Sequence, residues 1–171
     1  MIIEQALEFL GKHQPLPSDE EISEAEIDTF NEVRKFLISN PDERAIPLVL
    51  NAFGDEDGFG VYQVCDDIFR PFKPEVVLPH LKNELASKHY GVRYWAAQWA
   101  MEINSLDIVP EINAMLATPE DTEAHYYCVA ALMDIWQKTK NPFVSKSIIE
   151  LGGKSKNTDI SELIDEHKTQ K

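Results

Sequence analysis

The sequence predicts an all-α protein built as an α–α superhelix, a solenoid of about five antiparallel helical pairs. Apolar residues recur at helical spacing, and no segment alternates apolar and polar residues as a strand would. One segment pattern recurs in the middle of the chain, and prolines, glycines and helix-capping residues separate the helical stretches. The chain has 171 residues, 43% of them apolar, so we expect one domain over 1–171.

Residues 1–40 are expected to form two N-terminal capping helices. The short first helix carries apolar residues on one face: Ile2, Ile3, Ala6, Leu7 and Leu10. Ser18 belongs to the residue types that cap helices, so we expect it to begin a longer second helix. That helix has a regular apolar stripe: Ile27, Phe30, Val33 and Leu37. Terminal helices of an array need a polar outer face, which explains why these two depart from the repeat.

Three repeats follow the N-terminal cap. Each begins with a short apolar segment around a proline, and these prolines are 32 and 31 residues apart: Pro47, Pro79 and Pro110. A second helical stretch follows each segment: 60–69, 91–100 and 123–132. The alignment predicts repeats over 41–72, 73–104 and 105–140. Because each proline falls several residues inside its expected helix, we expect a bend there in every repeat.

Asparagine–proline pairs mark the starts of two helices. In Asn40-Pro41 and Asn141-Pro142, each asparagine is expected to cap a helix that begins at its proline. The second of these helices should end at Gly152-Gly153, and a last short helix should begin at Thr158. Residues 141–171 are therefore expected to form the C-terminal capping helices.

The two cysteines fall on equivalent positions of the repeat. Cys65 and Cys128 align with Ala96, which is typical of a small, buried core position. Two cysteines are also too few for a disulfide framework or a zinc cage. We expect them to fill the core, and the sequence predicts no metal and no cofactor.

Residues 91–116 combine several features of a known repeat. The second helix opens with Val-Arg and contains a pair of alanines, and the next helix brings an aspartate and a Val-Pro: Val92, Arg93, Ala96, Ala97, Asp107, Val109 and Pro110. This segment resembles the HEAT-like repeat of the phycobilisome-lyase type, and the resemblance extends over about residues 41–138. It implies stacked helical pairs. It does not imply lyase chemistry, because such repeats occur in many unrelated non-enzymatic proteins.

The charge is strongly acidic and unevenly distributed. Residues 1–58 hold 14 acids and 4 bases (net −10), whereas residues 59–171 hold 16 and 12 (net −4). Such a field disfavours direct nucleic-acid binding. It would attract a basic protein partner, although a well-solvated acidic surface is the explanation that we favour. No signal peptide or membrane-spanning apolar run is found, so we expect a cytoplasmic protein that does not engage membranes.

Polar and aromatic residues of the second helices are the candidate partner-binding residues. In a repeat array these helices usually line the concave groove. The alignment places eight such residues there: Gln63, Asp67, Arg70, Arg93, Tyr94, Gln98, His125 and Tyr126. Tyrosine and arginine are common in binding hot spots. The alternative is packing between neighbouring repeats, which we favour for Trp95 and Trp99 and weigh evenly for Tyr94 and Tyr126.

Acidic segments also raise a metal or acid–base interpretation. Asp55–Gly60 has the acids and glycines of an EF-hand loop, but Phe59 and Asp66 stand where an oxygen ligand and a glutamate are needed. Asp66 and Asp67 would point apart on a helix, and Glu120–Glu123 beside a histidine fits a helix start. Turns and helix dipoles explain these acids more simply.

The function that fits these observations is non-catalytic. We expect a protein–protein interaction module whose concave groove holds a protein or peptide, with an oligomeric state that the sequence leaves open. One alternative is an immunity or inhibitor protein that neutralises a basic toxin domain, which would suit the acidic first third. A lyase-like enzyme is the other alternative, although no phosphate-binding loop or nucleophile elbow is present.

Overall fold

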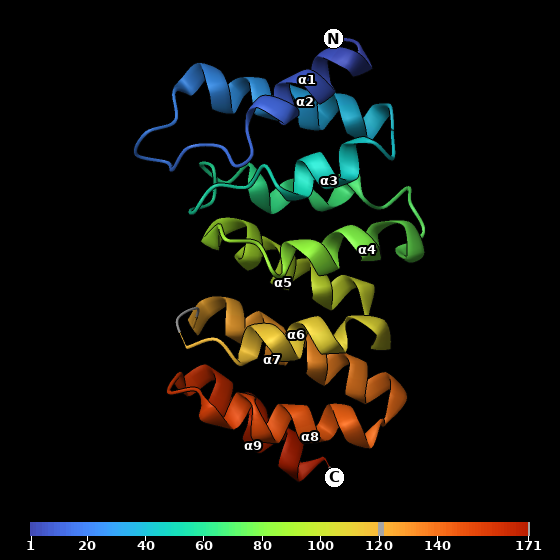
Figure 1. The fold of residues 1–171 in the computed structure, drawn as a ribbon, viewed down its shortest axis with the longest axis vertical. Helices are drawn as coiled ribbons and strands as arrows, with labels where there is room; N and C mark the ends of the chain where they lie inside the picture. Colours follow the sequence, from blue (N-terminus) through green and yellow to red (C-terminus); the bar gives the residue numbers. More distant parts are fainter. Residues whose placement is uncertain (120–121, 171) are drawn as a thin grey trace. The chain divides into compact units, whose positions relative to one another are not determined.

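The computed structural model describes residues 1–119 and 122–170, and all regular secondary structure in them is helical (Figure 1). The all-α prediction is therefore confirmed for these residues. The chain divides into two compact units, Met1–Val92 (unit 1) and Arg93–Lys171 (unit 2). Their boundary falls inside one continuous helix, α5 (Tyr90–Ile103).

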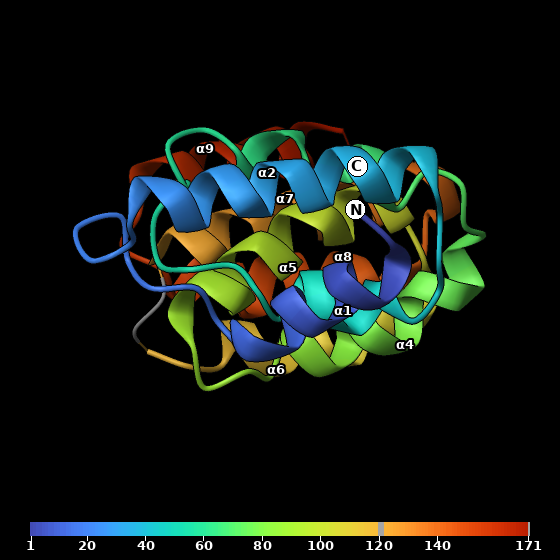
Figure 2. The ribbon, with the colours of Figure 1, turned by 90° about the horizontal axis from the view of Figure 1, so that it is seen from above.

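Unit 1 is built from four α-helices and two short 3-10 helices before α5 begins. In chain order these are α1 (Ile3–Lys12), α2 (Glu24–Ser39), α3 (Ala45–Leu50), η1 (Tyr62–Val64), η2 (Asp66–Ile68) and α4 (Pro74–Glu84). Helix α1 packs against both α2 and α3, and α3 packs against α4. Figures 1 and 2 show α2 lying beside α1, with α3 beneath α1.

The start of α2 differs from the prediction. Ser23, not Ser18, is its N-cap: the Ser23 side chain accepts a hydrogen bond from the Glu26 N–H, and the Glu26 carboxylate accepts one from the Ser23 N–H. The Ser23 hydroxyl also donates to the Glu26 carboxylate, at 2.6 Å, and this bond, together with the one from the Ser23 N–H, lowers the pKa of Glu26. Ser18 begins only a turn, in which its carbonyl accepts from the N–H groups of Glu21 and Ile22. Both serines have a glutamate three residues later, so the capping-box pattern alone does not separate them.

The expected second helix of the first repeat, 60–69, is replaced by η1 and η2. The backbone at Gly58, Phe59 and Gly60 has positive φ, so no α-helix can run through this loop. At the other end Pro71 lacks an N–H and would clash with the carbonyl four residues earlier in a continued helix. The core positions of the expected helix nevertheless stay buried, because two 3-10 turns still direct Cys65 and Ile68 inward.

The repeat prolines do not bend every first helix, which corrects that prediction. Pro47 is the third residue of α3, and Pro110 is the second residue of α6 (Val109–Leu116). At these positions a proline removes no intrahelical hydrogen bond, because the first N–H groups of a helix have no partner within it. Only Pro79 of the three lies inside its helix. Asn40, expected to begin a helix, is instead the C-cap of α2.

An aromatic cluster fills the core of unit 1. The rings of Phe30, Phe53 and Tyr62 meet edge to face, with centroid separations of 6.2 Å (Phe30–Phe53), 5.5 Å (Phe30–Tyr62) and 5.1 Å (Phe53–Tyr62). All three side chains are buried. Edge-to-face pairs add about 0.5–1.5 kcal/mol each beyond burial of their area. The cluster joins α2 to the chain on both sides of the loop at 54–61.

In its described residues, unit 2 contains the rest of α5 and six further helical elements. In chain order these are η3 (Leu106–Ile108), α6, α7 (Thr122–Thr139), α8 (Pro142–Glu150), η4 (Gly152–Lys154) and α9 (Thr158–Thr169). Helix α7 packs against α6, α8 and α9. Asn141 caps α8 by accepting from the Phe143 N–H, so the predicted start of this helix is confirmed. The predicted start of the last helix at Thr158 is also confirmed.

A buried polar contact links the last three long helices. Ser145 on α8 and His167 on α9 are both buried, and Oγ of Ser145 lies 2.8 Å from Nε2 of His167. The His167 ring also meets the ring of Trp136 on α7 edge to face, at 4.3 Å between centroids. Two buried polar groups that lose each other as partners pay a large desolvation cost. This contact therefore favours one position of α9 against α8.

Candidate functional site

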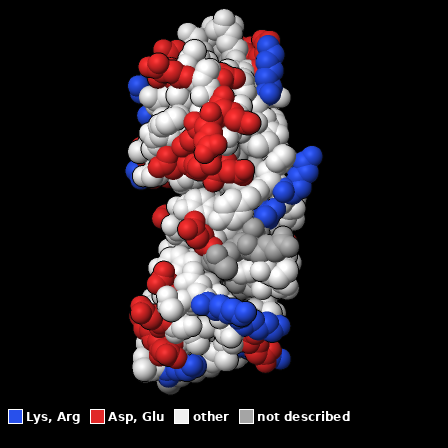
Figure 3. Space-filling model, turned by 90° about the vertical axis from the view of Figure 1, so that its left-hand side faces the viewer, with Lys and Arg blue, Asp and Glu red and all other residues white. Residues whose placement is uncertain are grey.

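Two loops of unit 1 bring acidic side chains together. They supply three consecutive acids each, and we call the resulting surface, together with Phe59, the acidic loop surface: Asp19, Glu20, Glu21, Asp55, Glu56, Asp57 and Phe59. Most of these side chains are exposed. Figure 3 shows acidic side chains gathered over this part of unit 1, with few basic ones among them. Such a surface produces a negative potential that attracts cationic groups.

Asp19 holds the two loops together. Its N–H donates to Oε2 of Glu56 at 2.9 Å. In return its carboxylate accepts from the N–H groups of Gly58, at 3.1 Å, and Phe59, at 3.4 Å. Hydrogen bonds from backbone N–H groups to a carboxylate offset part of the repulsion between neighbouring acids. The acids are therefore kept close by defined contacts and are not simply adjacent in sequence.

Phe59 is presented to solvent at the centre of these contacts. Its side chain is 65% exposed, and its backbone adopts the left-handed conformation with φ of 52°. For a residue other than glycine this conformation costs about 1–2 kcal/mol. The glycines on both sides also have positive φ, and Gly58 packs so closely over the Tyr62 ring that a Cβ would overlap it. The fold thus holds an aromatic ring outward at an energetic cost.

Two carboxylates of the 55–57 segment accept backbone hydrogen bonds, Asp57 within the turn itself and Asp55 from the start of α5. Asp57 accepts from the Gly60 N–H at 3.0 Å, and Asp55 accepts from the Gly91 N–H at 3.1 Å. These contacts support the turn explanation that the sequence favoured over a calcium loop. Among the described residues no group of three or more His, Cys, Asp or Glu side chains is placed to hold a metal ion. Part of Glu120–Glu123 lies outside the described residues.

Three predicted partner-binding residues lie in unit 1, next to the acidic loop surface in sequence. Gln63 is exposed and donates to Oδ2 of Asp57 at 3.0 Å. Arg70 forms ion pairs with Asp66, at 2.6 Å, and Asp67, at 2.8 Å. One guanidinium therefore bridges two carboxylates that an α-helix would have directed apart. All of these groups are partly or largely exposed, so the ion pairs contribute little to stability.

The other predicted residues belong to unit 2, where tyrosines form a chain of ring contacts. Tyr94 on α5 meets Tyr127 on α7 at 5.5 Å between centroids, and Tyr127 meets Tyr126 at 5.4 Å. All three are half-buried. We call them the tyrosine surface; the half-buried Gln98 and Arg93 lie on the same helix as Tyr94. Each tyrosine thus has a packed part and an exposed part, which explains why the sequence could not choose between core and groove.

Trp95 and Trp99 are both buried, which confirms that they pack in the core. His125 is also buried, with only 7% of its surface exposed. Its Nε2 lies 3.0 Å from the Met115 carbonyl oxygen and 3.3 Å from the Thr118 hydroxyl. These contacts fasten the end of α6 to α7 and leave little of the ring for a partner. We therefore leave His125 out of the proposed binding surfaces.

Sequence reasoning missed Phe59 and Tyr127 as candidate binding residues. The signal for Phe59 is an aromatic residue between two glycines in an acidic turn, but a turn alone accounts for such glycines. The signal for Tyr127 was its place next to Tyr126. In both cases exposure depends on the local backbone conformation, which the residue pattern does not specify.

Comparisons with known proteins add no relative: no protein-family model, curated protein or solved structure matches the chain. Within the described part of the chain, no helix combines the length and apolar character needed to cross a bilayer.

Proposed function

We propose that this chain is a non-catalytic protein-binding module that captures a basic protein or peptide on its acidic loop surface. The observation that carries the proposal is Phe59, an exposed aromatic ring held outward by a left-handed backbone whose N–H donates to the Asp19 carboxylate. Backbone strain that other contacts maintain is typical of functional sites. A ring held in this way has lost most of its freedom before a partner arrives, which lowers the entropic cost of binding.

The two kinds of side chain would have different roles in recognition. The acids would attract and orient lysine or arginine side chains, which raises the association rate and makes it salt-sensitive. The Phe59 ring would bury apolar area against the partner, and aromatic residues are enriched at the centres of protein interfaces. The partner expected from this chemistry is a basic segment with at least one apolar side chain.

The tyrosine surface of unit 2 is proposed as a second contact region. Tyr94 and Tyr126 have rings fixed by neighbouring aromatics and keep an exposed part, as binding tyrosines commonly do. Gln98 and Arg93 would add polar contacts there, and Gln63, Asp67 and Arg70 would add them in unit 1.

A second candidate function is an immunity or inhibitor protein that neutralises a basic toxin domain. The acidic loop surface favours it, because six of the 14 acids of residues 1–58 lie on the two loops that also carry the exposed Phe59. Inhibition would follow from covering the cationic site of the toxin. If the wild-type chain abolishes toxin activity on mixing and a variant with Phe59 replaced does not, this function is distinguished from general scaffolding.

We also propose that the helical pairs form a HEAT-like superhelix. The support is the three aligned repeats and the helical pairs α4–α5, α6–α7 and α8–α9 that follow one another in the chain. Small-angle X-ray scattering tests it. A compact domain of 171 residues has a radius of gyration of about 15–16 Å. We expect a clearly larger value and an elongated distance distribution, whereas a value near 15 Å would contradict the superhelix.

Replacement of Phe59 tests the binding proposal. In fluorescence anisotropy with lysine- and arginine-rich peptides, with and without an apolar residue, Phe59→Ala is expected to weaken binding at least about tenfold. Phe59→Gly should weaken binding to the same extent while raising the free energy of unfolding by about 1 kcal/mol, because glycine relieves the strain. Chemical denaturation followed by circular dichroism measures this second effect.

The matched control is Phe143→Ala, since Phe143 is 57% exposed and lies in the other unit. This control should leave peptide binding unchanged. Acidic peptides of the same length should not bind, and rising salt should weaken the basic peptides. If the chain binds no basic peptide, or if both phenylalanine variants bind equally well, the acidic loop surface is not the binding site.

A further inference from the structure

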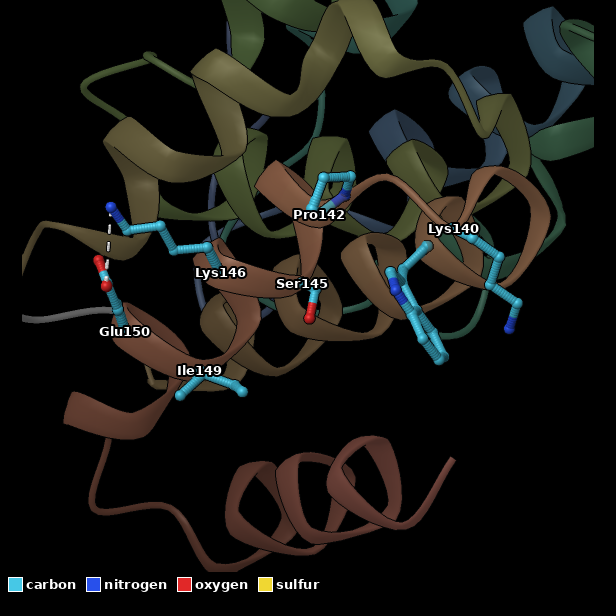
Figure 4. A pocket seen from close by; sticks show the side chains of 7 residues that line it. Lys140, Pro142, Ser145, Lys146, Ile149 and Glu150 are labelled. Atoms are coloured by element: carbon cyan, nitrogen blue, oxygen red, sulfur yellow. Dashed lines mark ion pairs between the residues drawn. The ribbon is translucent and has the colours of Figure 1, made fainter. Parts of the chain in front are cut away.

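A groove lies along α8 and the end of α7, in unit 2, and we call it the C-terminal groove. Its volume is about 470 Å³. Three apolar and three charged residues line it: Trp136, Pro142, Ile149, Lys140, Lys146 and Glu150. Ser145 also lies in the lining, but its hydroxyl already contacts His167. Figure 4 shows Lys140 towards one end of the groove and Lys146 with Glu150 towards the other.

Lys140 is held over the ring of Trp136. It directly follows α7 and has a φ of 51°, the left-handed conformation that glycine most often adopts after a helix. Its N–H donates to the Trp136 carbonyl at 2.7 Å, and its ammonium lies 3.8 Å from the centre of the Trp136 ring. A costly backbone conformation therefore places a long cationic side chain at this end of the groove.

The two ammonium groups of the lining are available to an anionic partner. In the part of the chain that the structure describes, the Lys140 ammonium contacts the Trp136 ring and forms no ion pair. Cation–π contacts at exposed sites are weak, so this ammonium can exchange the ring for a carboxylate at little cost. Lys146 is only loosely paired, at 3.8 Å from Glu150, and both of these side chains are largely exposed.

The groove is basic in a chain that is acidic as a whole. Two ammonium groups and one carboxylate line it, a net formal charge of +1, whereas the chain totals −14. The surrounding sequence has the same sign, because residues 136–157 hold five lysines and one acid (net +4). An anionic partner is therefore attracted to this segment and repelled by residues 1–58, whose net charge is −10.

We propose that the C-terminal groove binds an acidic segment of another protein that carries at least one apolar side chain. The apolar side chain packs on Pro142 and Ile149, and burial of that area drives the contact. Because the two lysines lie towards opposite ends of the groove, carboxylates on both sides of the apolar residue can pair with them. This inference uses residues outside the acidic loop surface and does not rest on the proposed function.

Peptide titrations test the proposal. Labelled peptides rich in aspartate and glutamate, with and without a central leucine, are titrated with the full chain and followed by fluorescence anisotropy. The leucine peptide is expected to bind, more weakly as salt rises. The peptide without leucine, which is the acidic control for the acidic loop surface, should not bind, because charge attraction alone is weak at exposed sites.

Single substitutions locate the site. Lys140→Gln should weaken binding of the leucine peptide at least about tenfold, because the chain length is kept and the charge is lost. Glu150→Gln should strengthen binding about threefold, because it removes the carboxylate of the lining and releases Lys146. The matched control is Lys154→Gln, which removes one charge from an exposed lysine outside the groove and should change the affinity less than about twofold. Phe59→Ala should leave it unchanged, which separates this inference from the proposed function.

The indole N–H signal of Trp136 in a nitrogen–proton NMR spectrum gives a readout at the groove itself. Assigned with Trp136→Phe, it should shift when the leucine peptide binds, because the Lys140 ammonium leaves the ring. The proposal is overturned if the leucine peptide does not bind, if the peptide without leucine binds equally well, if Lys140→Gln and Lys154→Gln have equal affinities, or if the Trp136 signal is unchanged in the bound state. Thermal melts by circular dichroism verify that every variant is folded.

Discussion

Gly91→Ala is expected to destabilise unit 1 more than any other single methyl group added to the chain. Gly91 lies in the first turn of α5, directly against the backbone of the 54–55 segment. A Cβ at this position would overlap the carbonyl carbon and oxygen of Gly54, and neither atom belongs to a side chain that could rotate away. The Gly91 N–H also donates to Asp55, so moving the helix would break that contact.

Relief of this overlap requires a shift of α5 or of the loop at 54–61. Overpacking of this kind costs about 1–3 kcal/mol and sometimes more, and we expect at least 3 kcal/mol because backbone meets backbone. Urea denaturation of the full chain measures the change. The matched control is Gly11→Ala in α1, where a Cβ meets nothing within 4 Å and alanine should stabilise the helix by about 0.5–1 kcal/mol. Equal midpoints for the two variants would refute the packing argument.

Tyr62→Ala is expected to have the second large effect, on stability and on partner capture together. The Tyr62 side chain is buried, and it contacts Phe30 and Phe53 edge to face. Truncation of a buried aromatic residue costs about 3–5 kcal/mol, to which two lost edge-to-face contacts contribute. Because Gly58 rests on the same ring, the loop that presents Phe59 would lose its support.

Tyr62→Phe separates the packing of the ring from its hydroxyl. Phenylalanine keeps both ring contacts and the support beneath Gly58, so most of the stability and peptide binding should remain. Burial raises the pKa of the Tyr62 hydroxyl, so it stays protonated across the physiological range. Denaturation midpoints and peptide anisotropy of the three proteins provide the comparison. A Tyr62→Ala protein that binds peptide as tightly as wild type would show that the loop needs no support from this ring.

The helices could be predicted where apolar spacing and capping residues agree. Pro142 and Thr158 begin α8 and α9 directly after the capping residues Asn141 and Asn157, and an apolar stripe follows in each helix. Cys65 and Cys128 are both fully buried, as their shared repeat position indicated. In each case the local pattern and the burial of one face lead to the same structure, and no contact distant in sequence has to be known.

The rest depended on contacts between segments far apart in the chain. Ser18 and Ser23 are equivalent by pattern, and Asp19 distinguishes them, since its hydrogen bonds to residues 58 and 59 hold the first segment in a turn. The exposure of Phe59 follows from the same contacts. His125 shows the opposite case: a polar residue aligned with the groove turns inward because the Met115 carbonyl accepts its hydrogen bond. Periodicity identifies a helical face, but not what its polar side chains meet.

The two buried thiols give each unit its own chemical probe of structural opening. The chain has two cysteines, and one lies in the core of each unit: Cys65 in unit 1 and Cys128 in unit 2. Alkylating reagents attack the thiolate, and burial both shields Cys65 and raises the pKa of its thiol, so modification must await opening of the surrounding structure. Pulsed alkylation followed by peptide mass spectrometry would therefore time the opening of the two halves separately in one sample. It would show whether α5, which is shared by both, makes them open together.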